Sequence, residues 1–173
     1  MKNKRGQYYL IAAMIIIVIL ASFISVINFA SKNSNDAMKE IEKELNNEIE
    51  EILNYATMQD LSSIEYKNIF KNMSSNYISK FSGKTTIFLY GDKTNLTVKG
   101  KNSYNETLTF SDGNGFTILK TGVGEFEENY LLLADTGILK MEDVEHSFQF
   151  PKGQGFYYLI SNRDGGENNL IRG

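Results

Sequence analysis

Residues 8–30 read YYLIAAMIIIVILASFISVINFA, a predominantly apolar run of 23 residues without a charged side chain. At about 1.5 Å per residue, a helix of this length extends roughly 34 Å, enough to cross a hydrocarbon core of about 30 Å. The run is rich in β-branched residues, but a chain in lipid must satisfy its backbone groups within its own helix. Since no later segment is comparably long and apolar, the sequence predicts a single transmembrane helix over residues 7–30.

The charges on either side of the run predict its orientation. Lys2, Lys4 and Arg5 lie directly before it, whereas Lys32, Lys39 and Lys43 follow it at a similar distance, so that the count alone is even. Lys and Arg are enriched on the cytoplasmic side of membrane spans. The denser basic cluster and the α-amino group favour an N-terminus inside, with the residues after the run outside the cell membrane.

The four residues Lys4-Arg5-Gly6-Gln7 have the composition of a processed junction, because a short basic stretch ends in Gly just before the apolar run. A conventional secretory signal has a shorter apolar core of about 7–15 residues and small residues before its cut. With this junction and run, the chain resembles archaeal type IV pilin-like proteins that carry a class III signal peptide. In that family a prepilin peptidase cuts after a basic-Gly pair, and Gln is a frequent first mature residue. The resemblance implies a leader over residues 1–6, recognition through Lys4 and Arg5, and cleavage between Gly6 and Gln7.

The resemblance also implies a function. Proteins of this family are subunits or accessory components of surface filaments, so the implied partners are membrane lipid, a prepilin-type peptidase, like subunits and other envelope proteins. The chain departs from the family at Ile11, the fifth residue after the cut, where many pilins carry Glu. An uncleaved membrane anchor with a fortuitous Arg-Gly-Gln sequence is the alternative.

Composition limits what the remaining residues can be. About 143 residues follow the apolar run, sufficient for one compact domain plus a helix. The chain has no cysteine, which excludes disulfides, thiolate chemistry and cysteine-based metal sites. Between Asp36 and Asp60 eight carboxylates accompany two lysines, a formal charge of −6. That charge repels phosphate backbones and argues against nucleic-acid binding.

The acidic stretch has helical periodicity. Its apolar residues recur every three or four positions, which places them on one face: Met38, Ile41, Leu45, Ile49, Ile52 and Ala56. Residues 62–83 have a similar spacing of aromatic and aliphatic side chains. We therefore expect an acidic amphipathic helical stalk over residues 31–83, with its apolar face on a β-sheet. A stripe that only seals the domain core and a coiled-coil pairing are alternatives.

From Lys84 onward the pattern becomes alternating, with β-branched and aromatic residues separated by Gly, Asp and Asn turns. The expected strands cover residues 86–90, 95–99, 107–110, 116–119, 130–134, 138–141, 147–150 and 156–161. Short connections of this kind join antiparallel neighbours. The predicted fold class is α+β. An N-terminal transmembrane helix continues into or is followed by an amphipathic helix, and residues 84–173 form an antiparallel meander or sandwich head outside the cell.

Candidate catalytic and metal-binding residues are few. His146 is the sole histidine and lies in the sequence Glu142-Asp143-Val144-Glu145-His146, whose spacing does not place all its ligand-type side chains on one face of a strand or helix. We expect this segment to be a solvated loop before the strand at Ser147. No nucleophile elbow accompanies the histidine. The Asp and Asn residues of the glycine-rich turns lack a full calcium-loop pattern. We therefore expect no catalytic residue, no metal and no cofactor.

Three glycan acceptor sequences follow the apolar run, at Asn72, Asn95 and Asn105. A chain with this content of Asn, Ser and Thr contains about as many such sequences by chance. The three asparagines are therefore candidate glycosylation sites, and their presence does not by itself imply modification. Together the sequence predicts a non-enzymatic, single-pass surface protein of the pilin-like class. The alternative is a permanently anchored ectodomain that binds envelope polymers or a partner protein, and a tethered hydrolase dependent on His146 is a third hypothesis.

Overall fold

The structure is a computed structural model that describes residues 36–141, 143–150, 155–164 and 167–173. The chain divides into two compact units, residues 1–39 and residues 40–173. Of the first unit the structure describes only residues 36–39, which are helical. The second unit contains all other described residues.

The first helix of the second unit extends through residue 58. Its stripe residues Ile41, Leu45, Ile49, Ile52 and Ala56 are all buried or half-buried, and Leu45 has no exposed surface. The helix ends in a left-handed turn, because Leu61 N donates to Ala56 O at 3.1 Å and Asp60 has a φ of 49°. Such a turn satisfies carbonyls at the end of a helix and stops it.

The second helix, α2 (Ser63–Lys80), starts immediately after this turn. Ser62 and Glu65 form a capping box, in which each side chain accepts a hydrogen bond from the other residue's backbone N–H. Its buried side chains are Tyr66, Phe70, Met73, Ser74, Tyr77 and Ile78. The helix over residues 62–83 expected from the apolar spacing is therefore present.

Nine strands in the described residues form two antiparallel sheets. The five-stranded sheet has the order β5-β2-β1-β8-β9 and the four-stranded sheet the order β4-β3-β6-β7. The strands are β1 (Thr85–Asp92), β2 (Asn95–Asn102), β3 (Thr107–Ser111), β4 (Phe116–Thr121), β5 (Gly124–Tyr130), β6 (Thr136–Met141), β7 (Val144–Gln149), β8 (Gly155–Asp164) and β9 (Glu167–Arg172).

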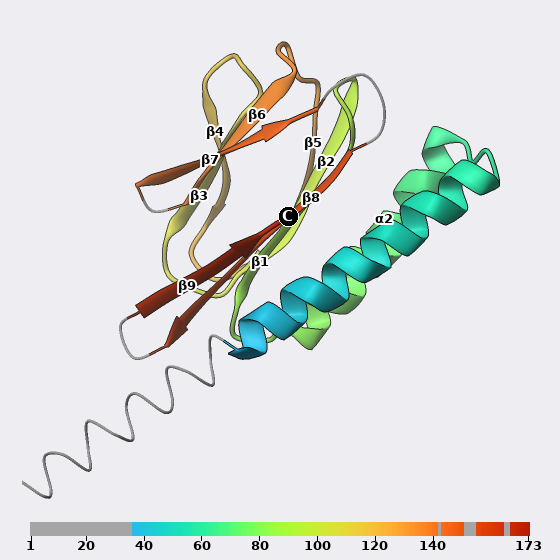
Figure 1. The fold of residues 1–173 in the computed structure, drawn as a ribbon. Helices are drawn as coiled ribbons and strands as arrows, with labels where there is room; N and C mark the ends of the chain where they lie inside the picture. The colour runs from blue at the N-terminus through green and yellow to red at the C-terminus, as the bar shows by residue number, and fades with distance from the viewer. Residues whose placement is uncertain (1–35, 142, 151–154, 165–166) are drawn as a thin grey trace, which may run out of the picture. The chain divides into compact units, whose positions relative to one another are not determined.

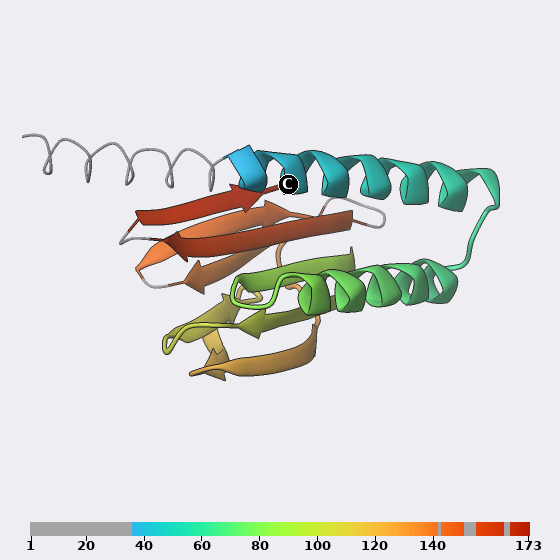
Figure 2. The ribbon, with the colours of Figure 1, turned by 90° about the horizontal axis from the view of Figure 1, so that it is seen from below.

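The second unit has three layers. The two helices cover one face of the five-stranded sheet, and the four-stranded sheet covers the other (Figure 1). In Figure 2 the first helix lies along β8 and β9, whereas α2 lies along β1 and β2. Hydrogen bonds fix the helix pair, since the Tyr77 hydroxyl donates to Glu48 at 2.6 Å and Lys80 donates to Glu44 at 2.6 Å. The Tyr158 hydroxyl on β8 donates to Asn46 of the first helix at 2.9 Å.

Two cores share the central strand β1, because successive side chains of a strand point to opposite faces. Ile87 and Leu89 belong to the core between the sheets, with Leu108, Phe110, Leu139 and Phe150 among its members. Phe88 and Tyr90 belong to an aromatic layer under the helices, formed with Phe70, Tyr77 and Phe156. Every β1 residue from Thr85 to Gly91 is consequently buried.

The fold class expected from the sequence is wrong for the described part of the chain. No helix there combines the length and the apolar character needed to cross a bilayer. The helical segment also breaks at residues 59–62 into two helices, because the left-handed Asp60 and the Ser62 cap end one helix and begin another. Of the two expected arrangements of the head, a meander or a sandwich, the strands form two packed sheets, and β1 pairs with the distant β8. The expected transmembrane helix over residues 7–30 lies outside the described residues.

Candidate functional site

The predicted leader residues lie outside the described part of the chain. These are Lys4 and Arg5, expected to be recognised by the peptidase, and Gly6 and Gln7, expected to flank the cut. The predicted junction therefore rests on the sequence.

The three glycan acceptor sequences lie on different elements and differ in exposure. Asn72 is exposed on α2, but the Ser74 of its sequon is fully buried. Asn95 is exposed at the start of β2 and accepts a hydrogen bond from Lys67 Nζ at 2.7 Å, whereas the Thr97 of its sequon is buried. Asn105 lies in the loop between β2 and β3, and both it and its sequon residue Thr107 are exposed. Only the Asn105 sequon thus presents both functional side chains on the folded surface.

His146 is a buried residue of β7, opposite Leu139 in the ladder with β6. Its Nε2 has no hydrogen-bond partner among the described residues. Burial lowers the pKa of His146, and the positive charge of Arg172 lowers this pKa further. Asp143 and Glu145 are exposed, and the part of the chain that the structure describes contains no group of three metal-binding side chains. His146 is therefore an inward-facing side chain of a strand, and the expectation that it lies in a solvated loop is wrong.

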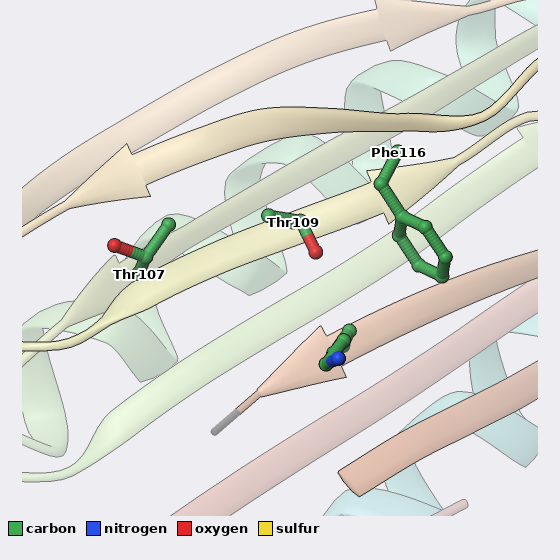
Figure 3. Close-up of a pocket in the computed structure, with 4 residues that line it drawn as sticks. Thr107, Thr109 and Phe116 are labelled. Atoms are coloured by element: carbon green, nitrogen blue, oxygen red, sulfur yellow. The ribbon is translucent and has the colours of Figure 1, made fainter. Parts of the chain in front are cut away.

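A hollow of about 310 Å³ lies on the outer face of the four-stranded sheet. Thr107 and Thr109 of β3, Phe116 of β4 and Lys140 of β6 line it (Figure 3). This face is the one that neither the helices nor the other sheet covers (Figures 1 and 2). Sequence reasoning did not identify these residues as a site.

Alternation of side chains along β3 produces the hollow. Leu108 and Phe110 point inward and have no exposed surface, so Thr107 and Thr109 point outward. Thr109 pairs with Lys140 on one side and with Ile118 on the other. Two short threonines therefore lie between the longer side chains of the flanking strands, which makes a trough along the middle of the sheet.

The chemistry of the trough is that of hydroxyl groups beside a ring. The Phe116 side chain is 50% exposed. The Thr109 hydroxyl oxygen is buried and has no hydrogen-bond partner in the described structure. Lys140 Nζ has Asp143 at 3.9 Å, a long contact to a carboxylate that is itself in solvent. A buried hydroxyl without a partner costs free energy.

The alternation Thr-Leu-Thr-Phe over residues 107–110 was visible in the sequence as a strand with one apolar face. The sequence also predicted strands over residues 116–119 and 138–141. It did not predict that these strands, β4 and β6, flank β3, because that pairing depends on the topology of the sheet. Comparisons with protein-family models, curated proteins and solved structures give no match to this chain.

Proposed function

We propose that this protein is a non-enzymatic, single-pass surface protein of the pilin-like class, a subunit or accessory component of an envelope filament. The observation that carries the proposal is the junction Lys4-Arg5-Gly6-Gln7 directly ahead of the apolar run over residues 8–30. A prepilin-type peptidase removes residues 1–6, the run holds the protein in lipid, and residues 84–173 lie outside the cell. The N-terminus before processing is inside.

An exposed apolar surface at the turn between the two helices supports contacts with other subunits. Met58, Ile64 and Tyr55 are 81%, 73% and 54% exposed there, an unusual accumulation for a surface in permanent contact with water. In a filament, neighbouring copies cover such side chains. The fold supplies a rigid base for this surface, because α2 packs on β1 and β2.

The N-terminal residue of protein isolated from its native membrane tests the proposal. We expect mass analysis to find Gln7 at the N-terminus, and we expect Gly6→Ile to retain residues 1–6. Asn3→Ala, a leader substitution outside the junction, is the matched control and should be processed normally. Wild-type protein that keeps Met1 to Gly6 would contradict the assignment to this class.

Filament membership needs a separate measurement. We expect Met58→Lys with Ile64→Lys to lower the amount of protein in sheared filaments while leaving processing and folding unchanged. An equally exposed residue away from the helix turn, Leu131 (57% exposed), provides the control as Leu131→Lys.

The trough on the four-stranded sheet favours a second candidate function, a permanently anchored ectodomain that binds an envelope polymer or a partner protein. In that case the protein stays in the bilayer fraction and is missing from sheared filaments. The two functions therefore differ in one fractionation experiment.

A further inference from the structure

We propose that Asn114 is a site of spontaneous deamidation, at which the backbone nitrogen of Gly115 attacks the side-chain amide and the turn between β3 and β4 gains a carboxylate. The turn consists of residues 112–115, between the end of β3 and the start of β4. The proposal goes beyond the two candidate functions and rests on neither of them.

The sequence of the turn favours this reaction. Among all asparagines of the chain, Asn114 alone precedes a glycine. The attacking atom is the backbone nitrogen of the residue after the asparagine, and a side chain on that residue hinders its approach. Because glycine has no Cβ, its nitrogen is the least hindered and its backbone rotates most freely.

The conformation of the turn requires this glycine. Gly115 has a φ of 125°, which residues with a side chain rarely adopt. A Cβ built on Gly115 would have no atom within 4 Å, so the requirement comes from the backbone and not from crowding. The same open space leaves room for ring closure between Gly115 and Asn114. The reactive pair is therefore a consequence of how the hairpin turns.

The reacting side chain is accessible and unrestrained. Asn114 and Gly115 are both exposed at the tip of the hairpin. The Asn114 backbone N–H donates to Asp112 Oδ1 at 2.9 Å, but the Asn114 amide group has no hydrogen-bond partner within the described residues. Exposed tips with small and polar residues are also where a chain opens locally at low cost. The amide can therefore rotate toward the Gly115 nitrogen.

Asn102 provides the opposite case within the same fold. It precedes Ser103, also a small residue, but its side chain is fully buried. Its amide nitrogen donates to the carbonyls of Glu106 and Gly122, and its oxygen accepts two further hydrogen bonds. Rotation toward the Ser103 nitrogen would break these bonds in the interior. The fold therefore protects Asn102 and leaves Asn114 reactive.

The reaction has two balanced steps. The Gly115 nitrogen loses its proton and bonds to Asn114 Cγ, the bond from Cγ to the amide nitrogen breaks, and ammonia leaves. Water then opens the resulting five-membered ring at one of its two carbonyls. Opening at Cγ gives aspartate, whereas opening at the backbone carbonyl gives isoaspartate, whose main chain passes through Cγ. Overall one water is consumed, one ammonia is released, and a second carboxylate appears in the turn that contains Asp112.

Mass analysis of the full chain during incubation tests the proposal, with protein in detergent micelles from a host that adds no N-glycans. We expect a gain of about 1 Da per molecule, which peptide mapping places at residue 114, with isoaspartate among the products. The rate should rise with pH, because the attacking nitrogen must lose its proton. Asn114→Gln keeps an amide but cannot close a five-membered ring, so the rate at this position should fall about a hundredfold or more. Asn105→Gln, at an exposed asparagine of the β2–β3 loop, is the matched control and should leave the rate at Asn114 unchanged.

Synthetic peptides of residues 98–106 and 110–118 give the rates without the fold. We expect Asn114 in the folded chain to convert within about tenfold of its peptide, and Asn102 at least about a hundredfold more slowly than its own. The proposal is overturned if residue 114 stays unchanged while its peptide converts fully, or if Asn102 converts faster than Asn114. A product without isoaspartate would overturn it too, because direct hydrolysis of the amide forms no ring. Retention of residues 1–6 or absence from filaments affects none of these outcomes.

Discussion

Asn102 is a fully buried amide whose hydrogen-bonding groups are all used within the chain. Its Nδ2 donates to the carbonyls of Glu106 and Gly122 at 2.9 and 3.1 Å. Its Oδ1 accepts from Thr85 Oγ1 and from Tyr104 N, both at 3.1 Å. This one side chain thereby links the β2–β3 loop and the β4–β5 turn to the first residue of β1.

Replacing this amide by a carboxylate tests its contribution. Asn102→Asp keeps the shape but loses both N–H donors, so two carbonyls face a buried carboxylate. We expect the free energy of unfolding to fall by about 3 kcal/mol or more, measured by denaturant titration. Asn129→Asp is the control, because the exposed Asn129 uses its oxygen, which a carboxylate keeps, as acceptor from Thr97 Oγ1 at 2.8 Å. Equal losses in the two variants would contradict this account.

His146 should make stability depend on pH near neutrality. Its pKa is lowered in the folded state by burial and by Arg172, so the unfolded chain, whose histidine has the ordinary pKa of 6.5, binds the proton more tightly. Stability is therefore complete above about pH 6.5. It decreases as the pH falls through that value toward the folded pKa. We expect a larger loss between pH 7.5 and 5.5 for the wild type than for His146→Gln.

Carboxylates make stability depend on pH in a lower, acidic range. The pKa of Asp92 is lowered chiefly by the Thr94 hydroxyl, and the pKa of Glu127 chiefly by Lys71. Their stabilisation is present above the ordinary carboxyl pKa and is lost as the pH falls toward their folded values. Denaturant titrations at several pH values separate the two ranges, and an identical profile for His146→Gln would exclude the histidine as the source.

Glycan attachment, if the head is outside the cell, should select Asn105 among the three acceptor sequences. It is the only one whose asparagine and hydroxyl residue are both exposed after folding. We expect intact-mass analysis of native protein to show a glycan that Asn105→Gln removes. Asn72→Gln and Asn95→Gln should leave the mass of the glycan unchanged, and a glycan on Asn72 would contradict selection by the folded surface.

At the scale of elements, β2 depends on one glycine. A Cβ at Gly100 would lie 2.8 Å from Phe126 Cζ and 3.1 Å from Ile87 Cα, and it would also meet the Thr86 carbonyl. Since two of these neighbours belong to the backbone of β1, they cannot move without disturbing the sheet. We expect Gly100→Ala to lower the free energy of unfolding by about 3 kcal/mol or more. Lys101→Ala, half-exposed in the same strand, should change it little.

The sequence predicted those elements whose signal is local. Alternation over residues 86–90 predicted β1, and helical spacing from Tyr66 to Phe81 predicted α2. β5 was missed because Glu125, Glu127 and Glu128 interrupt the apolar pattern around Phe126, its one buried side chain. Residues 130–134 were predicted as a strand, but only Tyr130 belongs to one, at the end of β5. The residues after it form a connection, in which Leu132 is buried and the backbone N–H groups of Leu132 and Leu133 donate to the carbonyls of Lys93 and Asp112.

Features that depend on distant segments were not predictable from local pattern. Nothing near β1 indicates that β8, some 70 residues further on, is its neighbour. β9 pairs with β8, although its sequence is mostly polar. The trough was not predictable for the same reason. Local alternation places Thr107 and Thr109 on one face of a strand, but only the strand order of the sheet brings Phe116 and Lys140 beside them.

At the scale of the whole molecule, the shared sheet should make the second unit unfold as one. Phe88 packs toward the helices, with its ring 5.8 Å from that of Phe156, and Leu89 packs between the sheets. We expect Phe88→Ala and Leu89→Ala each to cost about 3 kcal/mol or more. In both variants, far- and near-ultraviolet circular dichroism should report coincident transitions. Helical signal that persists after the tertiary signal is lost would show that the layers unfold separately.

The acidic outer strand β5 affects how two copies of the molecule can approach each other. A free strand edge is a template for pairing with another molecule. β5 is an edge of the five-stranded sheet, and Glu125 and Glu128 are exposed along it. Mutual repulsion between these carboxylates disfavours edge-to-edge pairing of β5 strands from two copies. A continuous intermolecular sheet through this edge is therefore disfavoured even at high concentration.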